Sequence, residues 1–198
     1  MGRPVRRADP HPGHRAVKFT ATPLDGAYVI DIEPHADERG FFARTVCVDE
    51  MAASGLNGQF VQQSVSWNPH KGTLRGLHYQ ADPHAEEKLV RVTRGAVFDV
   101  IVDIRRSSPT FGQHFSIELS ADHHNALYVP KGFAHGFQTL SGDTEVLYEM
   151  TVKFVPGSAR GIRWDDADLG IDWPRTERLI SGRDLTLPSL SLAGDGEW

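Results

Sequence analysis

The chain has 198 residues, a hydrophobic fraction of 39% and a formal net charge of −5. This length and composition are typical of one globular domain with a sizeable core, and they exclude wholesale disorder. The single cysteine, Cys47, excludes a disulfide framework and a cysteine-based zinc finger, and no apolar run approaches the roughly 18 residues of a membrane span.

The first segment, residues 1–18, is predicted to be a mobile basic arm. It holds five basic residues against one acidic residue, a net charge of +4, and three prolines fall among its first thirteen positions. Proline and glycine at this density favour an irregular terminus. The segment lacks the apolar stretch of a secretory signal, so we expect a cytoplasmic protein. The acidic remainder of the chain gives no support to binding of nucleic acid or a membrane.

One short helix is predicted close to residue 50. Asp49 is the candidate N-cap for a helical run over 50–54, because its side chain can accept a hydrogen bond from a backbone N–H of the first turn. Gly55 can end the helix in the left-handed conformation.

Between residues 28 and 152 the dominant period is two, which indicates strands. In the segment 98–104 four apolar side chains share one face, and Asp99 and Asp103 lie on the other. In the segment 145–152 the residues Val146, Tyr148 and Met150 point one way. Many short strands and hardly any helix predict an all-β sandwich, jelly roll or barrel. The other strand-like runs are 28–32, 60–67, 73–79, 89–93, 115–119 and 126–129.

The strands and their turns define a single predicted domain over residues 19–184. The remainder, residues 185–198, shows no periodicity and is predicted to be a tail lying on the surface. No repeat of fixed period occurs, which excludes a propeller or a solenoid.

Two of the ten histidines are candidates for chemistry. His78 ends a strand-like run, and His135 follows a Pro-x-Gly-x-x-His turn that leads into another strand. An inward histidine is more often a hydrogen-bonded core residue than a catalyst, but two within one small barrel favour a site. A stable catalytic metal site needs three close ligands, and the sequence offers two at best. We therefore expect no metal.

A barrel without metal can use an inward histidine as a base for a carbon acid next to a carbonyl. Such a reaction needs a cation for the enolate and an acid on the opposite face. Lys88, ten residues after His78, is a candidate for the cation, and Tyr148 is a candidate for the acid. The alternatives are a lysine at the rim and a tyrosine in the core, and spacing alone does not decide between them.

Several long segments resemble the dTDP-4-dehydrorhamnose 3,5-epimerase family, in family order from about residue 28 to 184. The most specific is Gly-Thr-Leu-Arg-Gly-Leu-His-Tyr-Gln at 72–80, and Val-Pro-Lys-Gly-Phe-Ala-His-Gly-Phe at 129–137 is a second. Shorter matches lie at 88–91, 98–105, 108–112, 160–166 and 171–174.

The resemblance implies a double-stranded β-helix, the cupin-type jelly-roll barrel, that forms a homodimer and needs neither metal nor organic cofactor. It implies a dTDP-linked 4-keto-6-deoxyhexose as substrate, inverted at C3, C5 or both. By position, His78 matches the general base, Asp184 its carboxylate partner, Tyr148 the acid and Lys88 the residue that stabilises the enolate oxygen. The residues that match substrate-contacting positions are Arg39, Phe42, Gln62, Arg75, His135 and Arg183, and Phe154 retains the ring of an aromatic position.

Simple alternation puts Arg75 and His78 on opposite faces of one strand. Either a β-bulge intervenes or Arg75 acts from the rim. Five positions depart from the family pattern and touch the nucleotide end and the sugar rim: Arg44, Ser64, Lys153, Phe154, which lacks a hydroxyl, and Ala159.

Three functions remain open on the sequence. The first is an epimerase of the 3,5 type, and a single-centre epimerase from a specialised-metabolite pathway is its alternative. The second is a metal-dependent cupin enzyme, which the incomplete ligand set disfavours. The third is a catalytically silent binder of a sugar nucleotide.

Overall fold

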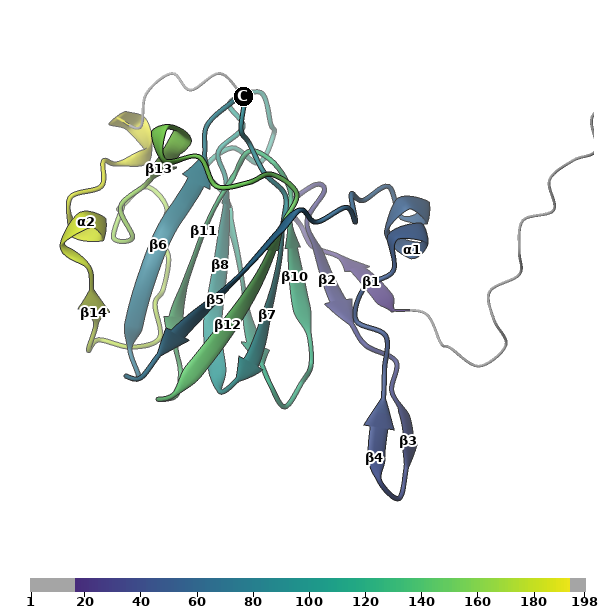
Figure 1. Cartoon of the computed structure of the whole chain (residues 1–198). Helices are drawn as coiled ribbons and strands as arrows, with labels where there is room; N and C mark the ends of the chain where they lie inside the picture. The colour runs from purple at the N-terminus through teal and green to yellow at the C-terminus, as the bar shows by residue number, and fades with distance from the viewer. Residues whose placement is uncertain (1–16, 193–198) are drawn as a thin grey trace, which may run out of the picture.

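The computed structural model describes residues 17–192. Two β-sheets face each other (Figure 1). Every strand pairing is antiparallel except that of β14 with β6. The first sheet has the order β1 (Lys18–Ala21), β2 (Tyr28–Asp31), β10 (Ala126–Val129), β7 (Lys88–Arg94), β12 (Thr144–Met150) and β5 (Gln62–Asn68). The second has the order β13 (Ala159–Gly161), β6 (Thr73–Gln80), β11 (Phe133–Thr139), β8 (Ala96–Asp103) and β9 (His114–Ser120), with β14 (Leu179–Ile180) also on β6.

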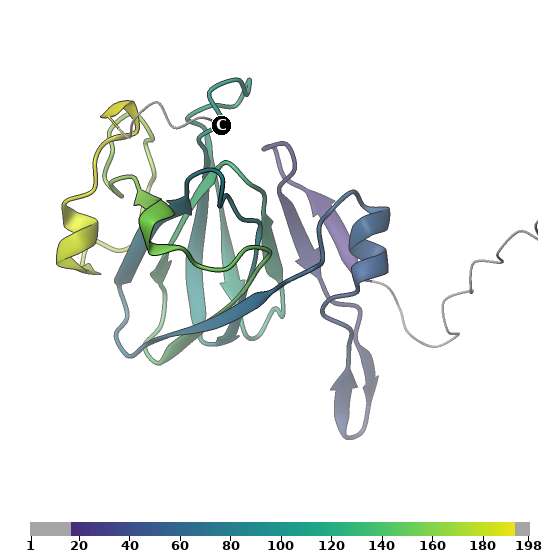
Figure 2. The ribbon, with the colours of Figure 1, turned by 45° about the horizontal axis from the view of Figure 1, so that its top comes forward.

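The other elements are short and flank the sheets. A hairpin of β3 (His35–Asp37) and β4 (Gly40–Phe42) projects beside α1 (Val48–Ala53), as Figures 1 and 2 both show. On the opposite side, the C-terminal segment carries β14 and α2 (Gly182–Leu185) (Figure 2). Two 3-10 turns complete the elements of the described part of the chain, η1 (Pro156–Ser158) and η2 (Leu190–Leu192). Within residues 17–192 no helix is long and apolar enough to cross a membrane.

The all-β double-stranded β-helix is confirmed, and the observed strands overlap all eight predicted strand-like runs. The run at 126–129 has the same bounds as β10, and the others differ by one or two residues at an end. The predicted arm at 1–18 falls almost wholly outside the described residues, although its last residue, Lys18, begins β1. The predicted tail at 185–198 begins on the last residue of α2 and lies within the described part only as far as residue 192.

The expected helix exists, but its predicted N-cap was wrong. The helix begins one residue earlier than Asp49, at Val48, with Cys47 as the N-cap and no side-chain capping bond. Asp49 lies in the first turn, where a negative charge still interacts favourably with the helix dipole. Gly55 follows the helix with a φ of +76°, the predicted left-handed conformation.

The main core lies between the two sheets and settles which face of β8 points inward. Val97 and Ile101 pack there with side chains of the first sheet such as Val90 and Val146. Asp99 and Asp103 share that inward face and are completely buried. Charged side chains on a buried face need partners, and both aspartates have them.

The outward face of the second sheet is buried as well. The apolar residues predicted to share one face of β8 pack against the C-terminal segment, with Phe98 in edge contact with Trp173 at 5.9 Å between ring centroids. The strand β14, which pairs in parallel with β6, belongs to the same covering segment. The segment after residue 160 therefore closes over β6, and it brings α2 to the strand that holds His78.

Of the two alternatives for Arg75 and His78, a β-bulge or a rim position for Arg75, the structure shows the β-bulge, in β6. Opposite it, the register of β11 passes from His135 paired with His78 to Phe137 paired with Arg75, so β6 contains one residue more. Gly76 lies in this β-bulge with a φ of +111°. A Cβ on Gly76 would lie 2.7 Å from the Cα of Gly136, so the two backbones meet too closely for any other residue.

Candidate active site

His78 and Asp184 form a hydrogen-bonded pair at the mouth of the barrel. His78 Nε2 lies 2.7 Å from Asp184 Oδ1, and the imidazole is 39% exposed while the carboxylate is 5% exposed. An ionised carboxylate only accepts hydrogen bonds, so Nε2 carries the hydrogen and the lone pair is on Nδ1. The pairing thus fixes the tautomer that a general base requires.

Asp184 is held by its own short helix and by the bulge. Ser181 caps α2 by accepting a hydrogen bond from the backbone N–H of Asp184. The second carboxylate oxygen accepts from the N–H of Gly76 at 3.3 Å. Burial disfavours the charged carboxylate, but the hydrogen bond with His78 and its charge outweigh this, so the pKa of Asp184 lies below its usual value. Asp184 therefore stays ionised beside the imidazole.

A second histidine–carboxylate pair lies deeper between the sheets. His135 Nε2 is 3.0 and 2.9 Å from the two carboxylate oxygens of Asp99, and both residues are buried. Burial raises the pKa of Asp99, against the opposing effects of His135 and the charge of Lys88. His135 forms the inner wall of the site, and Asp99 lies behind it.

Tyr148 contacts this wall from the opposite sheet. Its ring packs edge-on against His135 with 5.9 Å between centroids. Burial and the nearby charge of Asp99 hold the pKa of Tyr148 far above its usual value, despite the opposing charge of Arg75. The phenol therefore keeps its proton and can only give it to a strongly basic atom, such as a carbanion carbon. Tyr148 comes from β12 and His78 from β6, so the base and the acid lie on facing sheets.

Two adjoining cavities join these groups. The inner one, of about 240 Å³, is lined by Arg75, His78, Lys88, His135, Tyr148, Ser66, Gly136 and Phe137. The outer one, of about 160 Å³, shares His78 and Lys88 with the inner one and is also lined by Tyr79, Gln80, Glu86, Phe154, Ala159, Arg160 and Arg183. Their volumes suit a sugar ring in the inner cavity and a further group beyond it.

The structure brings together nine of the eleven predicted site residues. His78, Lys88, Tyr148, Arg75 and His135 line the inner cavity, while Phe154 and Arg183 line the outer one. Asp184 reaches the site through His78. Gln62 accepts a hydrogen bond from the backbone N–H of Phe154 at 3.0 Å, so it holds the outer wall in place.

Arg39 and Phe42 are not in the cavities of their own chain. Both lie on the β3–β4 hairpin, where Arg39 pairs with Asp37 and its side chain is 84% exposed. Phe42 is 64% exposed. The projection of the hairpin in Figure 1 explains the separation.

Besides Phe154 on the outer cavity, the departing positions differ in what they touch. Arg44 pairs with Glu50 of α1 at the base of the hairpin. Ser64 pairs with Tyr148 in the register of β5 and β12. The carbonyl of Lys153 accepts from Gln80 at 3.4 Å, and Ala159 lines the outer cavity. Among residues 17–192 no group of three side chains of the metal-ligating types is placed to hold a metal ion.

Sequence reasoning missed Asp99, Glu86, Ser66 and Arg160 as site residues. The signal for Asp99 was present, since an acidic residue within an apolar strand needs a buried partner if that face points inward. The apolar residues on both sides of β8 hid which face that was. Arg160 is the middle residue of the three-residue strand β13, and Glu86 lies on an irregular segment, so periodicity carries no information at either position.

Comparison with known proteins decides the family. The sequence model of dTDP-4-dehydrorhamnose 3,5-epimerase matches residues 21–191. The chain belongs to the dTDP-4-dehydrorhamnose 3,5-epimerase family. One relative of that name, from Methanothermobacter thermautotrophicus, is 44% identical over 157 residues, which is 79% of this chain and 84% of the relative.

Two other members of the family are similar to the chain, one compared by structure and one by sequence. The crystal structure of the Bacillus anthracis dTDP-4-dehydrorhamnose 3,5-epimerase, with TDP and PPi bound, has a TM-score of 0.85 and 41% identity, covering 88% of this chain and 99% of that one. A dTDP-4-dehydrorhamnose 3-epimerase from Streptomyces niveus is 35% identical, covering 87% of this chain and 83% of that one. Membership of the family makes the protein an isomerase-class carbohydrate epimerase.

Proposed function

We propose that the protein inverts C3 and C5 of a dTDP-linked 4-keto-6-deoxyhexose. The observation that carries this proposal is the placement of the His78–Asp184 pair and Tyr148 on facing sheets around one cavity, with Lys88 on its wall. A base and an acid on opposite sides of a sugar ring are what inversion of a carbon centre requires.

The chemistry begins with proton abstraction. His78 takes the hydrogen from the carbon next to the C4 ketone, and the electron pair of the broken C–H bond moves to the ketone oxygen as an enolate. The ammonium of Lys88 stabilises the negative charge on that oxygen. The Tyr148 phenol then protonates the same carbon from the other side. Exchange with solvent removes the proton from His78 and returns one to Tyr148, so each centre is inverted in turn.

The substrate itself supplies the electron sink. The ketone acidifies the hydrogens at C3 and C5 alike, so a single base serves both positions. We therefore expect activity without a metal ion or an organic cofactor. In the outer cavity, Arg160 and Arg183 supply positive charge for a diphosphate, and the exposed ring of Phe154 supplies a stacking surface for a base.

Reaction in deuterated water tests the proposal. Incorporation of deuterium at both C3 and C5 of the sugar is the expected result, and a sugar without label at C3 and without label at C5 would refute an epimerase. The His78→Ala variant should lose label incorporation and keep binding of dTDP, because Arg160, Arg183 and Phe154 of the outer cavity remain. Turnover by this variant at the wild-type rate would overturn the assignment of the base.

A 3-epimerase is the second candidate. It is favoured by the Streptomyces niveus relative of that activity and by the departures at Lys153 and Ala159 beside the outer cavity. The same experiment separates the two candidates, since a 3-epimerase labels C3 alone.

We also propose that the protein works as a homodimer. The hairpin carries Arg39 and Phe42 away from the cavity of their own chain, and the edge strand β5 exposes Val65 and Trp67. A second copy would cover the apolar surface of β5 and place the hairpin against a partner.

Light scattering in solution tests this assembly. The expected mass is twice the 21.9 kDa of the chain. Val65→Asp should give a monomer, because it places a charge in the proposed interface, whereas Leu179→Asp on β14 should remain dimeric. A wild-type protein with the mass of one chain would refute the dimer.

A further inference from the structure

The ammonium of Lys88 is held by a largely buried carboxylate, that of Glu86. Its Nζ lies 3.1 Å from Glu86 Oε1, and the two side chains are 12% and 10% exposed. Glu86 lies outside the segment 88–91 that carries the family resemblance. It nonetheless lines the outer cavity, next to the lysine that lines both cavities.

Glu86 is itself fixed from behind. Its other carboxylate oxygen accepts a hydrogen bond of 2.7 Å from the side-chain amide of Gln80, which is 3% exposed. The same amide group accepts from the N–H of Val155 at 2.6 Å and donates to the carbonyl of His84 at 3.2 Å. A carboxylate bound on one oxygen by an immobilised amide has little freedom, so its second oxygen fixes where the ammonium lies.

The carboxylate also connects the strand of the base with the strand of the cation. Gln80 lies two residues after His78 on β6, and Lys88 is the first residue of β7. The two strands belong to different sheets, so nothing in the strand pairing sets the distance between the base and the cation. The chain of contacts from Gln80 through Glu86 to Lys88 provides that link.

Without Glu86 the Lys88 ammonium would move to other positions. Its charge acts on Asp99 behind the inner cavity, while Arg75, Arg160 and Arg183 on the cavity walls repel it. A lysine side chain has four rotatable bonds, and a buried ammonium without a partner is strongly unfavourable. Its position at the junction of the cavities therefore depends on the carboxylate.

We propose that Glu86 is a positioning residue that holds the Lys88 ammonium at the place where the enolate oxygen forms. The proposal rests on the epimerase function above. In the reaction the enolate oxygen gains negative charge within reach of the ammonium, and Glu86 keeps the ammonium there before and after that charge develops. The diphosphate is assigned to Arg160 and Arg183 of the outer cavity, so we expect the affinity for the nucleotide to depend mainly on those two cations.

The test measures deuterium exchange at the carbons next to the ketone, with a dTDP-linked 4-keto-6-deoxyhexose as the probe. Glu86→Gln should lower kcat for exchange at least tenfold and change KM, and the Kd of dTDP, by less than twofold. Glu87→Gln is the matched control, because the neighbouring carboxylate contacts Thr151 and Lys131 instead of Lys88, and it should exchange at the wild-type rate.

A double-mutant cycle separates positioning from a general structural effect. In a Lys88→Met background, Glu86→Gln should lower exchange no further, since its effect passes through the lysine. If the loss is the same in both backgrounds, or if folded Glu86→Gln exchanges at the wild-type rate, the proposal is overturned.

The conservative variant keeps the proposal testable if Glu86→Gln does not fold. Glu86→Asp retains the charge but withdraws the carboxylate by one methylene, so kcat for exchange should fall with KM unchanged. A wild-type kcat in folded Glu86→Asp would overturn the proposal. Absence of exchange in the wild-type protein would instead refute the epimerase function, which distinguishes the two failures.

Discussion

Two histidine–carboxylate pairs in the site have different environments and therefore suit different tasks. His78 is partly exposed, and its partner Asp184 has a pKa below the usual value, so the pair combines an ionised carboxylate with an imidazole that solvent can reach. His135 and Asp99 are buried, and the pKa of Asp99 is raised. The first pair can exchange protons with substrate and solvent, while the second shapes the pocket and the electrostatic surroundings of Tyr148.

The raised pKa of Tyr148 leads to a prediction for Tyr148→Phe. The base remains, so hydrogen exchange next to the ketone should continue, with protons returned to the face from which they left. Inverted product should fall about 100-fold, within the usual contribution of a general acid. Nuclear magnetic resonance of the sugar in deuterated water measures label and configuration together. Inversion at the wild-type rate would show that another group supplies the proton.

At this scale, the sequence could predict the residues that carry chemistry better than the residues that support them. His78, Lys88 and Tyr148 were accessible because functional residue types stand at strand positions. Asp184 was reached only through the family resemblance, because 106 residues separate it from His78 and no local pattern connects them. Asp99 and Glu86 were missed because a supporting contact depends on which segments the fold brings together.

Among the elements, the β-bulge in β6 contributes most to the geometry of the site. It turns Arg75 and His78 into the same cavity although they are three residues apart, and it aims the N–H of Gly76 at Asp184. The alternation of the sequence indicated that either a bulge or a rim position was required. It could not choose between them, because the choice depends on the pairing with β11.

The close approach of β6 and β11 predicts the effect of Gly136→Ala. The new Cβ would lie 2.7 Å from the carbonyl oxygen of Arg75, which is backbone and has no alternative position. Relief of this contact should cost about 1–3 kcal/mol of stability and move Arg75 and His78. We expect a lower Tm and at least a tenfold loss of kcat for exchange.

Gly157→Ala is the control for this prediction, because a methyl group added at Gly157 would have nothing within 4 Å of it. It should retain the stability and the exchange rate of the wild type. A Gly136→Ala protein that matched this control in both measurements would show that the strands can separate without disturbing the site.

The accuracy of the sequence analysis at the level of elements followed their regularity. β10 was predicted to the residue because a short apolar run between turn signals has clear ends. α2 has four residues and β14 has two, which is too short for any periodicity. These are the elements that place Asp184, so the catalytic partner lies where pattern analysis is weakest.

At the scale of the whole molecule, the negative net charge does not indicate the charge of the ligand. The total is −5, yet the cavities are lined by Arg75, Lys88, Arg160 and Arg183. A focused cluster of cations in a cleft with apolar walls determines the local potential, whatever the sum over the surface. An acidic chain can therefore bind an anionic sugar nucleotide.

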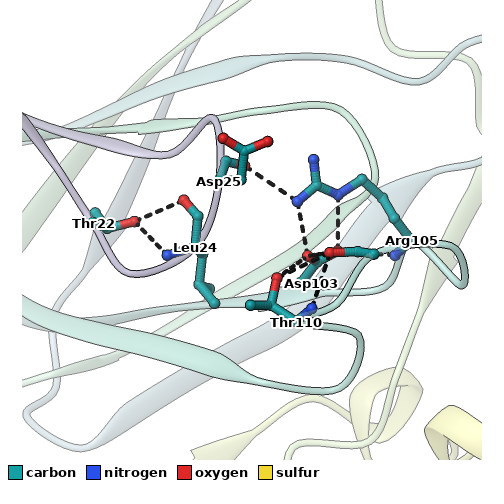
Figure 3. A network of polar contacts seen from close by, with 7 residues as sticks. Thr22, Leu24, Asp25, Asp103, Arg105 and Thr110 are labelled. Carbon is teal, nitrogen blue, oxygen red and sulfur yellow. Dashed lines mark hydrogen bonds and ion pairs between the residues drawn. The ribbon is translucent and has the colours of Figure 1, made fainter.

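Stability of the whole fold depends on a second buried aspartate, remote from the chemistry. Asp103, at the end of β8, accepts hydrogen bonds from Arg105 and Thr110 (Figure 3), and a third from Ser108. Arg105 also donates to the carbonyl of Asp25, in the turn between β1 and β2. The network thus joins a loop of the second sheet to a turn of the first. Despite the opposing effect of burial, these bonds lower the pKa of Asp103 to about 2.

This network predicts how stability changes with pH. The pKa of Asp103 is lower in the folded state than in the unfolded state, so its contribution is complete above about pH 4 and is lost as the pH falls toward 2. The shift from 3.8 to about 2 corresponds to about 2 kcal/mol. Asp103→Asn should lose about 3 kcal/mol of unfolding free energy at pH 7, because Arg105 is left without its anion. Between pH 4 and 2 the unfolding free energy of the variant should change less than that of the wild type. Urea unfolding at pH 7, 4 and 3 measures both effects.

Asp165→Asn is the control, since its ion pair with Arg163 is exposed and should contribute at most about 1 kcal/mol. Parallel losses in Asp103→Asn and the wild type below pH 4 would show that other carboxylates govern the acid sensitivity of the fold.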